Sequence, residues 1–400
     1  MSVKHNADGV DVKSLMREGL MGRVFPGAAA LVALRGEIVF FEYLGQRSLI
    51  PEPLPMLRDT VFDLASLTKP LATALCIMKL VDRGEIFLDQ SLADVIAHSD
   101  LREKGKLSFR SLLSHSAGLA DWKPYYEKLM DHPPEARKRL LREWIVDEPF
   151  AYEPGKENVY SDLGFMLLEW VIEEKTGLTI PQYAHDHLYE PLGLKRTFFR
   201  RTREERNAAW SLSAMPWNNH LRGNEITGLD GGAYGYTEEQ FAATEDCPWR
   251  KRVLCGEVHD DNAWALGGYS GHAGLFSTAE EVLVIAAMLL DHFYGRRQDF
   301  FRPETVREFF RRQGIVKGSD WALGWDTRAL EGSSAGKYFS RDSLGHTGFT
   351  GTSIWMDLDK DVIAILLTNR VHPTRNNERI KQFRPAFHDA VMEELGSASA

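Results

Sequence analysis

Cysteine is scarce in this sequence. Only three of the 400 residues are cysteines, Cys76, Cys247 and Cys255. Neither Cys247 nor Cys255 belongs to a C-x-x-C pair, which excludes a zinc ribbon. A small and odd number of cysteines is typical of a protein from a reducing compartment.

Long apolar runs are also lacking. The best candidates, Val282–Leu290 and Val362–Leu367, are much shorter than the roughly 18–20 residues that a membrane helix needs. The first residues, Met1–Asp8, contain no apolar stretch, so no secretory signal peptide is predicted. We therefore expect a cytoplasmic protein that does not interact with a membrane.

Positive charge is not in excess. The chain has 48 Lys and Arg against 57 Asp and Glu, a net charge of -9, so we expect no nucleic-acid partner. Hydrophobic residues make up 44% and charged residues 26%, which are ordinary globular values and exclude wholesale disorder. The composition predicts no particular oligomeric state.

Strand-type patterns occur near both ends of the chain, and helical patterns lie between them. The expected helices are Val12–Val24, Thr278–Phe293 and Asn377–Leu395, and the expected strands are Ala28–Leu34, Glu37–Tyr43, Ala322–Asp326, Thr352–Asp357 and Val362–Thr368. The predicted fold class is α+β. Residues 1–65 and 275–400 would form an antiparallel sheet flanked by helices, and residues 66–274 an inserted, mostly helical domain. The active site is expected in the cleft between them.

The first motif with chemical content is Ser66-Leu-Thr-Lys69, which precedes an apolar helical stretch. Ser66 is therefore expected at a helix N-terminus, with Lys69 one turn later on the same face. Serine needs a neighbouring base to act as a nucleophile, and a lysine can serve if burial or another cation lowers its pKa. The positive field of a helix N-terminus would favour an oxyanion. Taken alone, the motif is equally compatible with Ser66 as an ordinary N-cap.

Two further motifs follow along the chain. Tyr160-Ser-Asp162 precedes a helical stretch, where a tyrosinate beside cations can act as a general base or acid. The bland alternative is a buried tyrosine ahead of a helix. His346-Thr-Gly348 is expected to open a strand, and its glycine would let a substrate approach the backbone closely. A simple glycine-rich turn is the alternative.

The three motifs in this order resemble the serine β-lactamase and penicillin-binding protein superfamily, and most closely its branch of class C β-lactamases, DD-peptidases and related esterases. Segments that strengthen the resemblance are Leu112–Leu119, Glu153-Pro-Gly155, Pro191–Leu194 and Gly267–Thr278. It covers roughly residues 25–395 and implies a β-lactamase/transpeptidase-like fold.

The resemblance also implies roles for individual residues. Ser66 would be the acylated nucleophile, and Lys69 and Tyr160 would share the proton transfers. The backbone N–H groups of Ser66 and Phe349 would form the oxyanion hole.

The resemblance further implies that His346, Thr347 and Gly348 line the strand edge along which the substrate lies, with Asp162 beside it. Two of these residues depart from the usual pattern. Asp162 stands where asparagine is usual, and His346 where drug-hydrolysing members have lysine. The loss of a permanent cation weakens the case for an efficient β-lactamase and suits a less charged ester or amide.

The expected function is thus a serine hydrolase that forms an acyl-enzyme. Its expected partner is a small ester, amide or peptide substrate, and it needs no cofactor. An esterase or amidase is the first choice. A D-alanyl-D-alanine carboxypeptidase or weak β-lactamase is the alternative, followed by an inactive scaffold or sensor of the same fold.

Two rival sites are present in the sequence. Gly332-Ser-Ser-Ala-Gly336 fits the G-x-S-x-G nucleophile elbow, and Ser334 and Lys337 form a second S-x-x-K. The elbow needs a strand before it and a helix after it, and neither is expected, so we favour a surface loop.

A metal site is the second rival, because His259, Asp260, Asp261 and His272 are residue types that bind zinc. No ligand spacing such as H-E-x-x-H occurs, so we favour a hydrogen-bonded loop and expect no metal.

Overall fold

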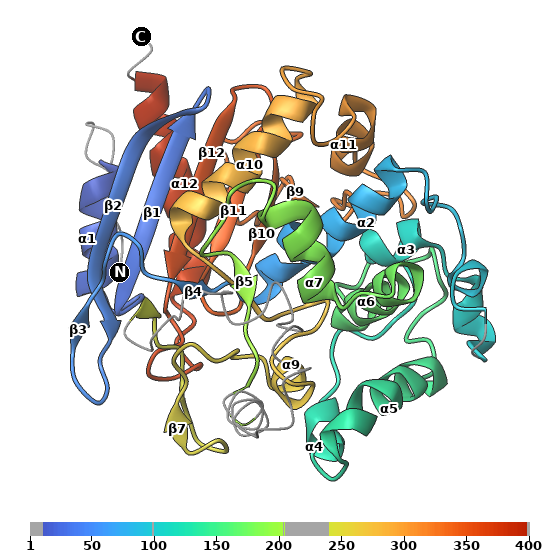
Figure 1. Cartoon of the computed structure of the whole chain (residues 1–400). Coiled ribbons are helices and arrows are strands. Elements are labelled where there is room, and N and C mark those ends of the chain that lie inside the picture. Colours follow the sequence, from blue (N-terminus) through green and yellow to red (C-terminus); the bar gives the residue numbers. More distant parts are fainter. Residues whose placement is uncertain (1–10, 98–99, 203, 205–239, 398–400) are drawn as a thin grey trace.

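The structure is a computed structural model that describes residues 11–97, 100–202, 204 and 240–397 (Figure 1). The first residues, on which the prediction about a signal peptide depends, lie outside the described part. None of the described helices is long and apolar enough to cross a membrane. The cytoplasmic location stays a prediction.

A seven-stranded antiparallel sheet joins the two ends of the chain, as predicted. Its order is β3-β2-β1-β12-β11-β10-β9. The strands are β1 (Gly27–Leu34), β2 (Glu37–Ser48), β3 (Leu54–Pro55), β9 (Asp326–Thr327), β10 (Leu344–Thr347), β11 (Ser353–Asp357) and β12 (Val362–Thr368). The N-terminal strand β1 pairs with β12 along its length, from Ala28 opposite Thr368 to Leu34 opposite Val362 (Figure 1).

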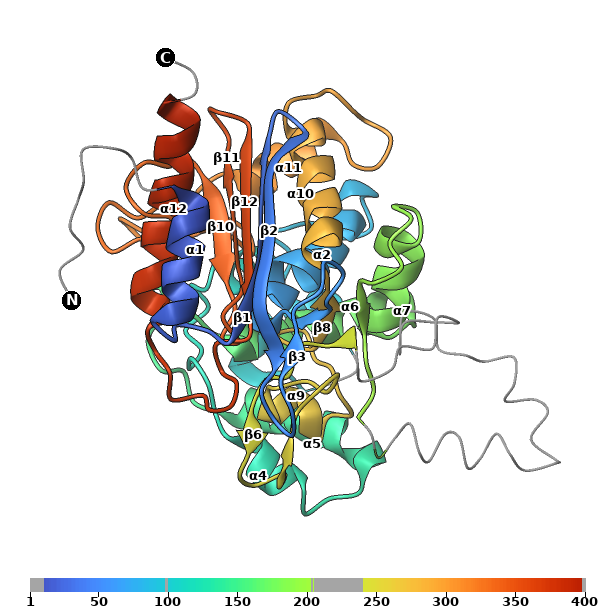
Figure 2. The ribbon, with the colours of Figure 1, turned by 90° about the vertical axis from the view of Figure 1, so that its left-hand side faces the viewer.

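Helices cover both faces of this sheet. Figure 2 shows α1 (Val12–Met21) and α12 (Ile380–Ser397) on one side, and α10 (Ala279–Phe293) and α2 (Ala74–Asp82) on the other. Both faces of β12 are buried, because alternate residues belong to different cores. Ala364 and Leu366 pack with α1 and α12, whereas Ile363, Ile365 and Leu367 pack with α10.

Along the sequence, the helical region lies between strands β1–β3 and strands β9–β12 of the seven-stranded sheet. Besides α2, its described α-helices are α3 (Phe109–Leu113), α4 (Tyr125–Leu129), α5 (Pro134–Asp147), α6 (Asp162–Thr176), α7 (Ile180–Ala184) and α9 (Asp261–Ala265), and α11 (Pro303–Phe310) follows α10. Short strands pair in two small sheets, β4 (Phe62–Asp63), β8 (Leu275–Ser277) and β5 (Phe198–Phe199) in one, and β6 (Asp246–Cys247) and β7 (Arg252–Val253) in the other. The division into two domains stays a prediction.

The interpretation of Ala322–Asp326 as a strand is wrong. Only Asp326 belongs to a strand, because the chain turns at Ala322–Trp325, where the Ala322 N–H donates to the Trp325 carbonyl at 3.0 Å. Gly324 has a φ of 81°, and a Cβ there would lie 2.5 Å from that of Ala74. The segment is apolar because it packs against α2 and Phe310, not because it lies within a sheet.

The prediction that His346-Thr347-Gly348 opens a strand is also wrong. His346 and Thr347 are the last two residues of β10, and Gly348 begins the turn that leads to β11. This turn, residues 348–352, is called the β10–β11 turn below. A glycine is required at its start, because a Cβ on Gly348 would lie 2.0 Å from Thr352 Oγ1 and 2.5 Å from the Leu64 carbonyl oxygen.

Candidate active site

Ser66 lies in a tight turn at the start of a helical segment. Residues Ala65–Leu67 form one 3-10 turn, Lys69–Thr73 a π-helical turn, and α2 follows directly. Ala65 has a φ of 48°, a conformation that costs energy for a residue with a side chain. The buried Asp63 holds this turn, because its Oδ1 accepts from the Ala65 N–H at 2.8 Å and its Oδ2 from the His259 N–H at 2.6 Å.

Lys69 lies beside Ser66, as the spacing predicts. Its Nζ is 3.2 Å from Ser66 Oγ, and its side chain is fully buried. It also lies 3.3 Å from the His272 carbonyl oxygen, within the Gly267–Thr278 segment that carries part of the family resemblance. The contacts with Ser66 and with the His272 carbonyl therefore fix the position of the Lys69 amine.

The structure pairs Lys69 with Asp162, a residue that the resemblance places beside the substrate. Lys69 Nζ and Asp162 Oδ1 are 2.6 Å apart. Burial lowers the pKa of Lys69, but the charge of Asp162 and the neighbouring Tyr160 outweigh burial, so the pKa is raised. The lowered lysine pKa that a free base needs is thus not found, and the resting site holds an ammonium–carboxylate pair.

Tyr160 immediately precedes α6, whose N-cap is Ser161. The Lys69 ammonium lies 4.7 Å from the centre of the Tyr160 ring. The buried hydroxyl faces Lys69 and Ser66 without a hydrogen bond of ordinary geometry. Burial raises the pKa of Tyr160, and the opposing effect of Lys69 is smaller, so the phenol is neutral at rest and suited to donate a proton.

His115 positions this tyrosine. It comes from the Leu112–Leu119 segment, which is also part of the resemblance. Its ring packs against Tyr160 with 4.7 Å between centroids and against Trp321 with 4.4 Å, and its Nδ1 accepts from the Ser161 N–H at 3.0 Å. Burial lowers the pKa of His115 well below its ordinary value, so the ring is an uncharged support.

His346 is buried at the end of β10, with its ring 5.7 Å from that of Tyr160. Burial, and secondarily the charge of Lys69, lowers the pKa of His346 to about 3. The imidazole is therefore neutral at physiological pH. It does not replace the permanent cation of a lysine at this position. Thr347 and Gly348 follow it at the strand end, as the motif requires.

The backbone N–H groups of Ser66 and Phe349 are candidates for an oxyanion hole. Among the described residues, neither N–H has a hydrogen-bond acceptor. Both residues line the same cavity, and Phe349 is half exposed there. Two unpaired donors at one cavity beside a serine hydroxyl are the arrangement that stabilises a tetrahedral oxyanion.

The cavity has a volume of about 340 Å³, which suits a small substrate. Its lining comes from both sides of the expected cleft: Ala65, Ser66, Asp121, Trp122, Tyr160, Asp162, His259, Asp260, Asp261, Ala273, Phe349 and Arg375. Arg375 is bound to Glu245 at 2.5 Å and to Asp261 at 3.2 Å. Arg375 is the only arginine or lysine among the described residues of this lining, and it is already paired with two carboxylates.

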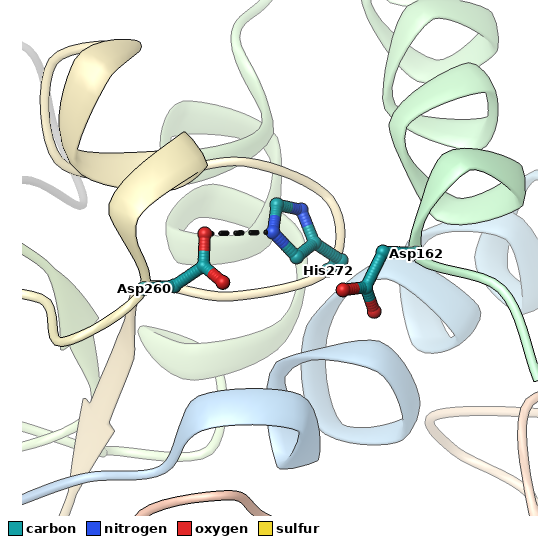
Figure 3. Close-up of side chains that lie close together, drawn as sticks. All are labelled: Asp162, Asp260 and His272. Carbon is teal, nitrogen blue, oxygen red and sulfur yellow. Dashed lines mark hydrogen bonds and ion pairs between the residues drawn. The ribbon is translucent and has the colours of Figure 1, made fainter. Parts of the chain in front are cut away.

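A metal ion has one conceivable position among the described residues. Ligand atoms of Asp162, Asp260 and His272 lie within 4.8 Å of one another. Figure 3 shows that Asp260 and His272 are hydrogen-bonded, at 2.9 Å between Oδ1 and Nε2. Asp162 is bound to the Lys69 ammonium, whose charge opposes a cation. The trio therefore does not fit a metal centre.

The residues of the rival metal site form separate contacts with other side chains. His259 lies 3.4 Å from Glu245, and Asp261 binds Arg250 at 2.6 Å. These contacts anchor the loop, as the favoured alternative predicts. The rival elbow at Gly332–Gly336 lies in a loop that begins after β9 ends at Thr327, so no strand leads directly into it and no helix directly follows it, and it lines a different cavity.

Several residues that shape the site were missed by sequence reasoning. Asp63 carries no motif, and nothing in the sequence distinguishes it. Arg384 has a detectable signal, because it shares a helical face with Ile380, Phe387 and Val391 at a spacing of three to four residues, where an apolar residue is expected.

Comparison with known protein families extends over nearly the whole chain. The family model described as Beta-lactamase matches residues 12–385. Relatives from Salmonella agona (strain SL483) and Salmonella typhimurium (strain LT2) carry the name "Putative D-alanyl-D-alanine carboxypeptidase". Each is 29% identical over 354 residues, which are 83% of this chain and 74% of the relative.

Solved structures share the fold. EstCE1, described as a hydrolase with promiscuous acyltransferase activity, is 20% identical with a TM-score of 0.69, covering 95% of this chain and 97% of its own. The octameric penicillin-binding protein homologue from Pyrococcus abyssi is 20% identical with a TM-score of 0.66, covering 96% and 77%. Simvastatin synthase LovD from Aspergillus terreus is 17% identical with a TM-score of 0.65, covering 96% and 97%.

Proposed function

The chain belongs to the beta-lactamase family of serine hydrolases, and from that premise we propose that it is an esterase or amidase that acts on a small substrate through an acyl-enzyme. One observation carries the proposal. Lys69 Nζ lies 3.2 Å from Ser66 Oγ at a cavity into which two unpaired backbone N–H groups can point. These are a nucleophile, its proton acceptor and an anion site in one place.

The proposed reaction begins with attack of Ser66 Oγ on the substrate carbonyl carbon. The hydroxyl proton passes to Lys69 in its free-amine form, and the carbonyl oxygen becomes an oxyanion bound by the N–H groups of Ser66 and Phe349. Collapse of this intermediate breaks the bond to the leaving group, which takes a proton from the Tyr160 hydroxyl, and the Lys69 ammonium returns a proton to Tyr160. Water then attacks the Ser66 ester, its oxygen joins the released acid, and one of its protons restores the Ser66 hydroxyl.

The electrostatics of the cavity support an uncharged acyl group. Asp121, Asp162, Asp260 and Asp261 line it, and its one arginine is already paired. His346 contributes no charge, because its pKa is about 3. A substrate carboxylate would therefore find no unpaired cationic side chain among the described residues that line the cavity.

A D-alanyl-D-alanine carboxypeptidase or weak β-lactamase is the second candidate. The names of the Salmonella relatives favour it. Both classes of substrate carry a free carboxylate. The described lining of the cavity offers no unpaired cationic side chain to bind it. An inactive scaffold or sensor ranks lower, because Ser66, Lys69 and Tyr160 are all present and close together.

We propose no cofactor, no metal, no nucleic-acid partner and no membrane partner. The chemistry above needs only the residues of the chain and water. Chelation of divalent metals should leave the hydrolysis rate unchanged, and loss of a stoichiometric metal together with activity would contradict this.

The test is a substrate panel run on the protein and on Ser66→Ala. We expect hydrolysis of p-nitrophenyl esters, with slower turnover of nitrocefin and D-Ala-containing peptides, and no turnover by the variant. Ser334→Ala is the matched control, because Ser334 would be the nucleophile of the rival elbow. Activity that survives in Ser66→Ala would refute the assignment, and a preference for D-Ala peptides would favour the second candidate.

A further inference from the structure

Two buried arginines lie behind the β10–β11 turn. Arg370 follows β12 and is 5% exposed, and Arg384 belongs to α12 and is 8% exposed. Among the described residues, neither has a carboxylate within ion-pair distance. Their hydrogen bonds go instead to backbone carbonyl oxygens, and the buried Arg384 Nε has no acceptor among the described residues.

This arrangement is energetically unusual. A buried cation is costly unless a charged or strongly polar partner compensates for the lost hydration. The same chain satisfies another fully buried arginine in the ordinary way, since Arg250 binds Asp261 at 2.6 Å and Glu257 at 3.4 Å. For Arg384, burial and the charge of Arg370 lower the pKa, yet a guanidinium stays protonated at neutral pH. Its positive charge is therefore left uncompensated beside the turn.

Three of the carbonyl groups that these arginines bind belong to the β10–β11 turn. Arg384 Nη2 donates to the Gly348 carbonyl at 2.6 Å and to the Thr352 carbonyl at 2.9 Å. Arg370 Nε donates to the Phe349 carbonyl at 2.8 Å. The Gly348 carbonyl and the Phe349 N–H belong to the same peptide group. That N–H is one of the two unpaired donors at the cavity.

We propose that Arg384 is a positioning residue for the oxyanion hole: its guanidinium polarises the Gly348–Phe349 peptide and so strengthens the Phe349 N–H as a donor to the transition state. Arg370 holds the next carbonyl and fixes the orientation of the turn. The inference rests on the proposed function, because it needs Phe349 to face an oxyanion.

The physical basis is the resonance of the peptide group. A charged donor on the carbonyl oxygen draws electron density from the amide nitrogen, and hydrogen bonds in series strengthen one another. The uncompensated charge also adds a positive potential behind the N–H. Both effects act most strongly on the negative charge that develops during attack, so they appear in kcat more than in KM.

The experiment compares Arg384→Met, Arg384→Gln and Arg384→Lys with the full-length wild type. The assays are kcat and KM for a p-nitrophenyl ester, and the affinity of an arylboronic acid, which forms an anionic tetrahedral adduct with a serine. The infrared carbonyl stretch of a ¹³C-labelled acyl-enzyme reports the polarisation directly. Arg379→Met is the matched control, because Arg379 also donates to backbone carbonyls, those of Gly22 and Arg23, away from the turn.

We expect Arg384→Met to lower kcat/KM by about 10- to 100-fold, less than the loss of a whole oxyanion-hole donor. KM should change by less than about twofold, boronate affinity should fall in parallel with kcat, and the carbonyl stretch should move to higher frequency. Arg384→Lys should retain more activity than the uncharged Arg384→Gln. Arg379→Met should behave as wild type.

A purely structural role predicts something else. Arg384→Met would then lower the melting temperature. In the folded enzyme, kcat/KM and boronate affinity would stay within twofold of the wild type, and the carbonyl frequency would not shift. This result would overturn the proposal. If Arg384→Met does not fold, equal activity of the Lys and Gln variants overturns it. Absence of Ser66 acylation in the wild type overturns the proposed function as well, whereas equal rates in acylated wild type and variants overturn the inference alone.

Discussion

The two sides of the cavity hold their buried cations in opposite ways. On the helical side, Lys69 is fully buried and paired with Asp162 at 2.6 Å. On the sheet side, Arg384 and Arg370 are buried without a carboxylate among the described residues and bind only backbone carbonyls. The Lys69–Asp162 pair on the helical side has no net charge. The two guanidinium groups on the sheet side have no carboxylate that neutralises them among the described residues.

This difference separates two tasks of acyl transfer. Proton transfer needs groups whose protonation can change, and a pair such as Lys69 with Asp162 can gain or lose a proton. Oxyanion stabilisation needs charges and dipoles that do not change during the reaction, and a guanidinium is always protonated. The following variants test whether each side performs only its own task.

The largest effect is expected from removing the cation of the helical side. Lys69→Met should lower the rate of Ser66 acylation by about a thousandfold or more, because no other amine lies beside Ser66 among the described residues. Rates of labelling by a fluorophosphonate at saturating probe would measure this. Lys79→Met is the control, since Lys79 lies on α2, directly after the π-helical turn of Lys69, but donates to the Phe300 carbonyl. Comparable loss in both variants would mean that the effect is one of folding.

The next largest effect is expected on the sheet side. Gly348→Ala should lower kcat/KM by about 100-fold, because the new Cβ would meet the Leu64 carbonyl at 2.5 Å and push the Phe349 N–H away from Ser66. Steady-state hydrolysis of a p-nitrophenyl ester is the assay. Gly396→Ala, where a Cβ meets nothing within 4 Å, should be neutral. Full activity in Gly348→Ala would show that the turn need not hold its position.

A smaller effect with a definite sign is expected at Asp162. The charge of Asp162 raises the pKa of Lys69, so Asp162→Asn should lower it and move the acid limb of the pH profile of kcat/KM to lower pH. At a pH below the Lys69 pKa of both the wild type and the variant, lowering that pKa by one raises the fraction of Lys69 in the free-amine form about tenfold. The other titratable groups whose pKa is affected by the charge of Lys69 are Tyr160, His115, His272, His346 and Asp260.

Asp121→Asn is the control for this change, because Asp121 lines the cavity without contacting Lys69. An acid limb that stays in place would show that Asp162 does not set the titration of Lys69. A profile that falls at every pH would instead indicate that Asp162 receives the proton from Lys69.

The smallest effect concerns substrate charge. His346→Lys should improve kcat/KM for a carboxylate-bearing substrate relative to a neutral ester by several-fold, since it supplies a cation at the strand end. In the wild type, lowering the pH from 7 to 5 should bring no gain in affinity for that substrate, because the pKa of His346 is about 3. His346→Gln is the uncharged control. An equal gain in both variants would attribute it to space and not to charge.

Much of the fold follows from local pattern. The continuous apolar runs of β1 and β12, and the turn Leu358-Asp359-Lys360 between β11 and β12, predict paired strands, and the structure confirms them. The spacing of Ser66 and Lys69 likewise fixes their proximity, because residues three apart on a helix share a face. The strand predicted at Ala322–Asp326 is wrong because burial in a loop and burial in a strand give the same apolar signal.

Residue types and their spacing predict the family, the sheet built from both ends of the chain, and the residues of the three motifs. The electrostatic states of these residues follow from the folded arrangement. It pairs Asp162 with Lys69, leaves His346 neutral, and brings Arg384 from the last helix to the carbonyl of Gly348. Residue type and spacing set which groups are neighbours along one element. The pKa of a group and the partner of a buried charge depend on atoms from distant segments and on the exclusion of water, which only folding brings about.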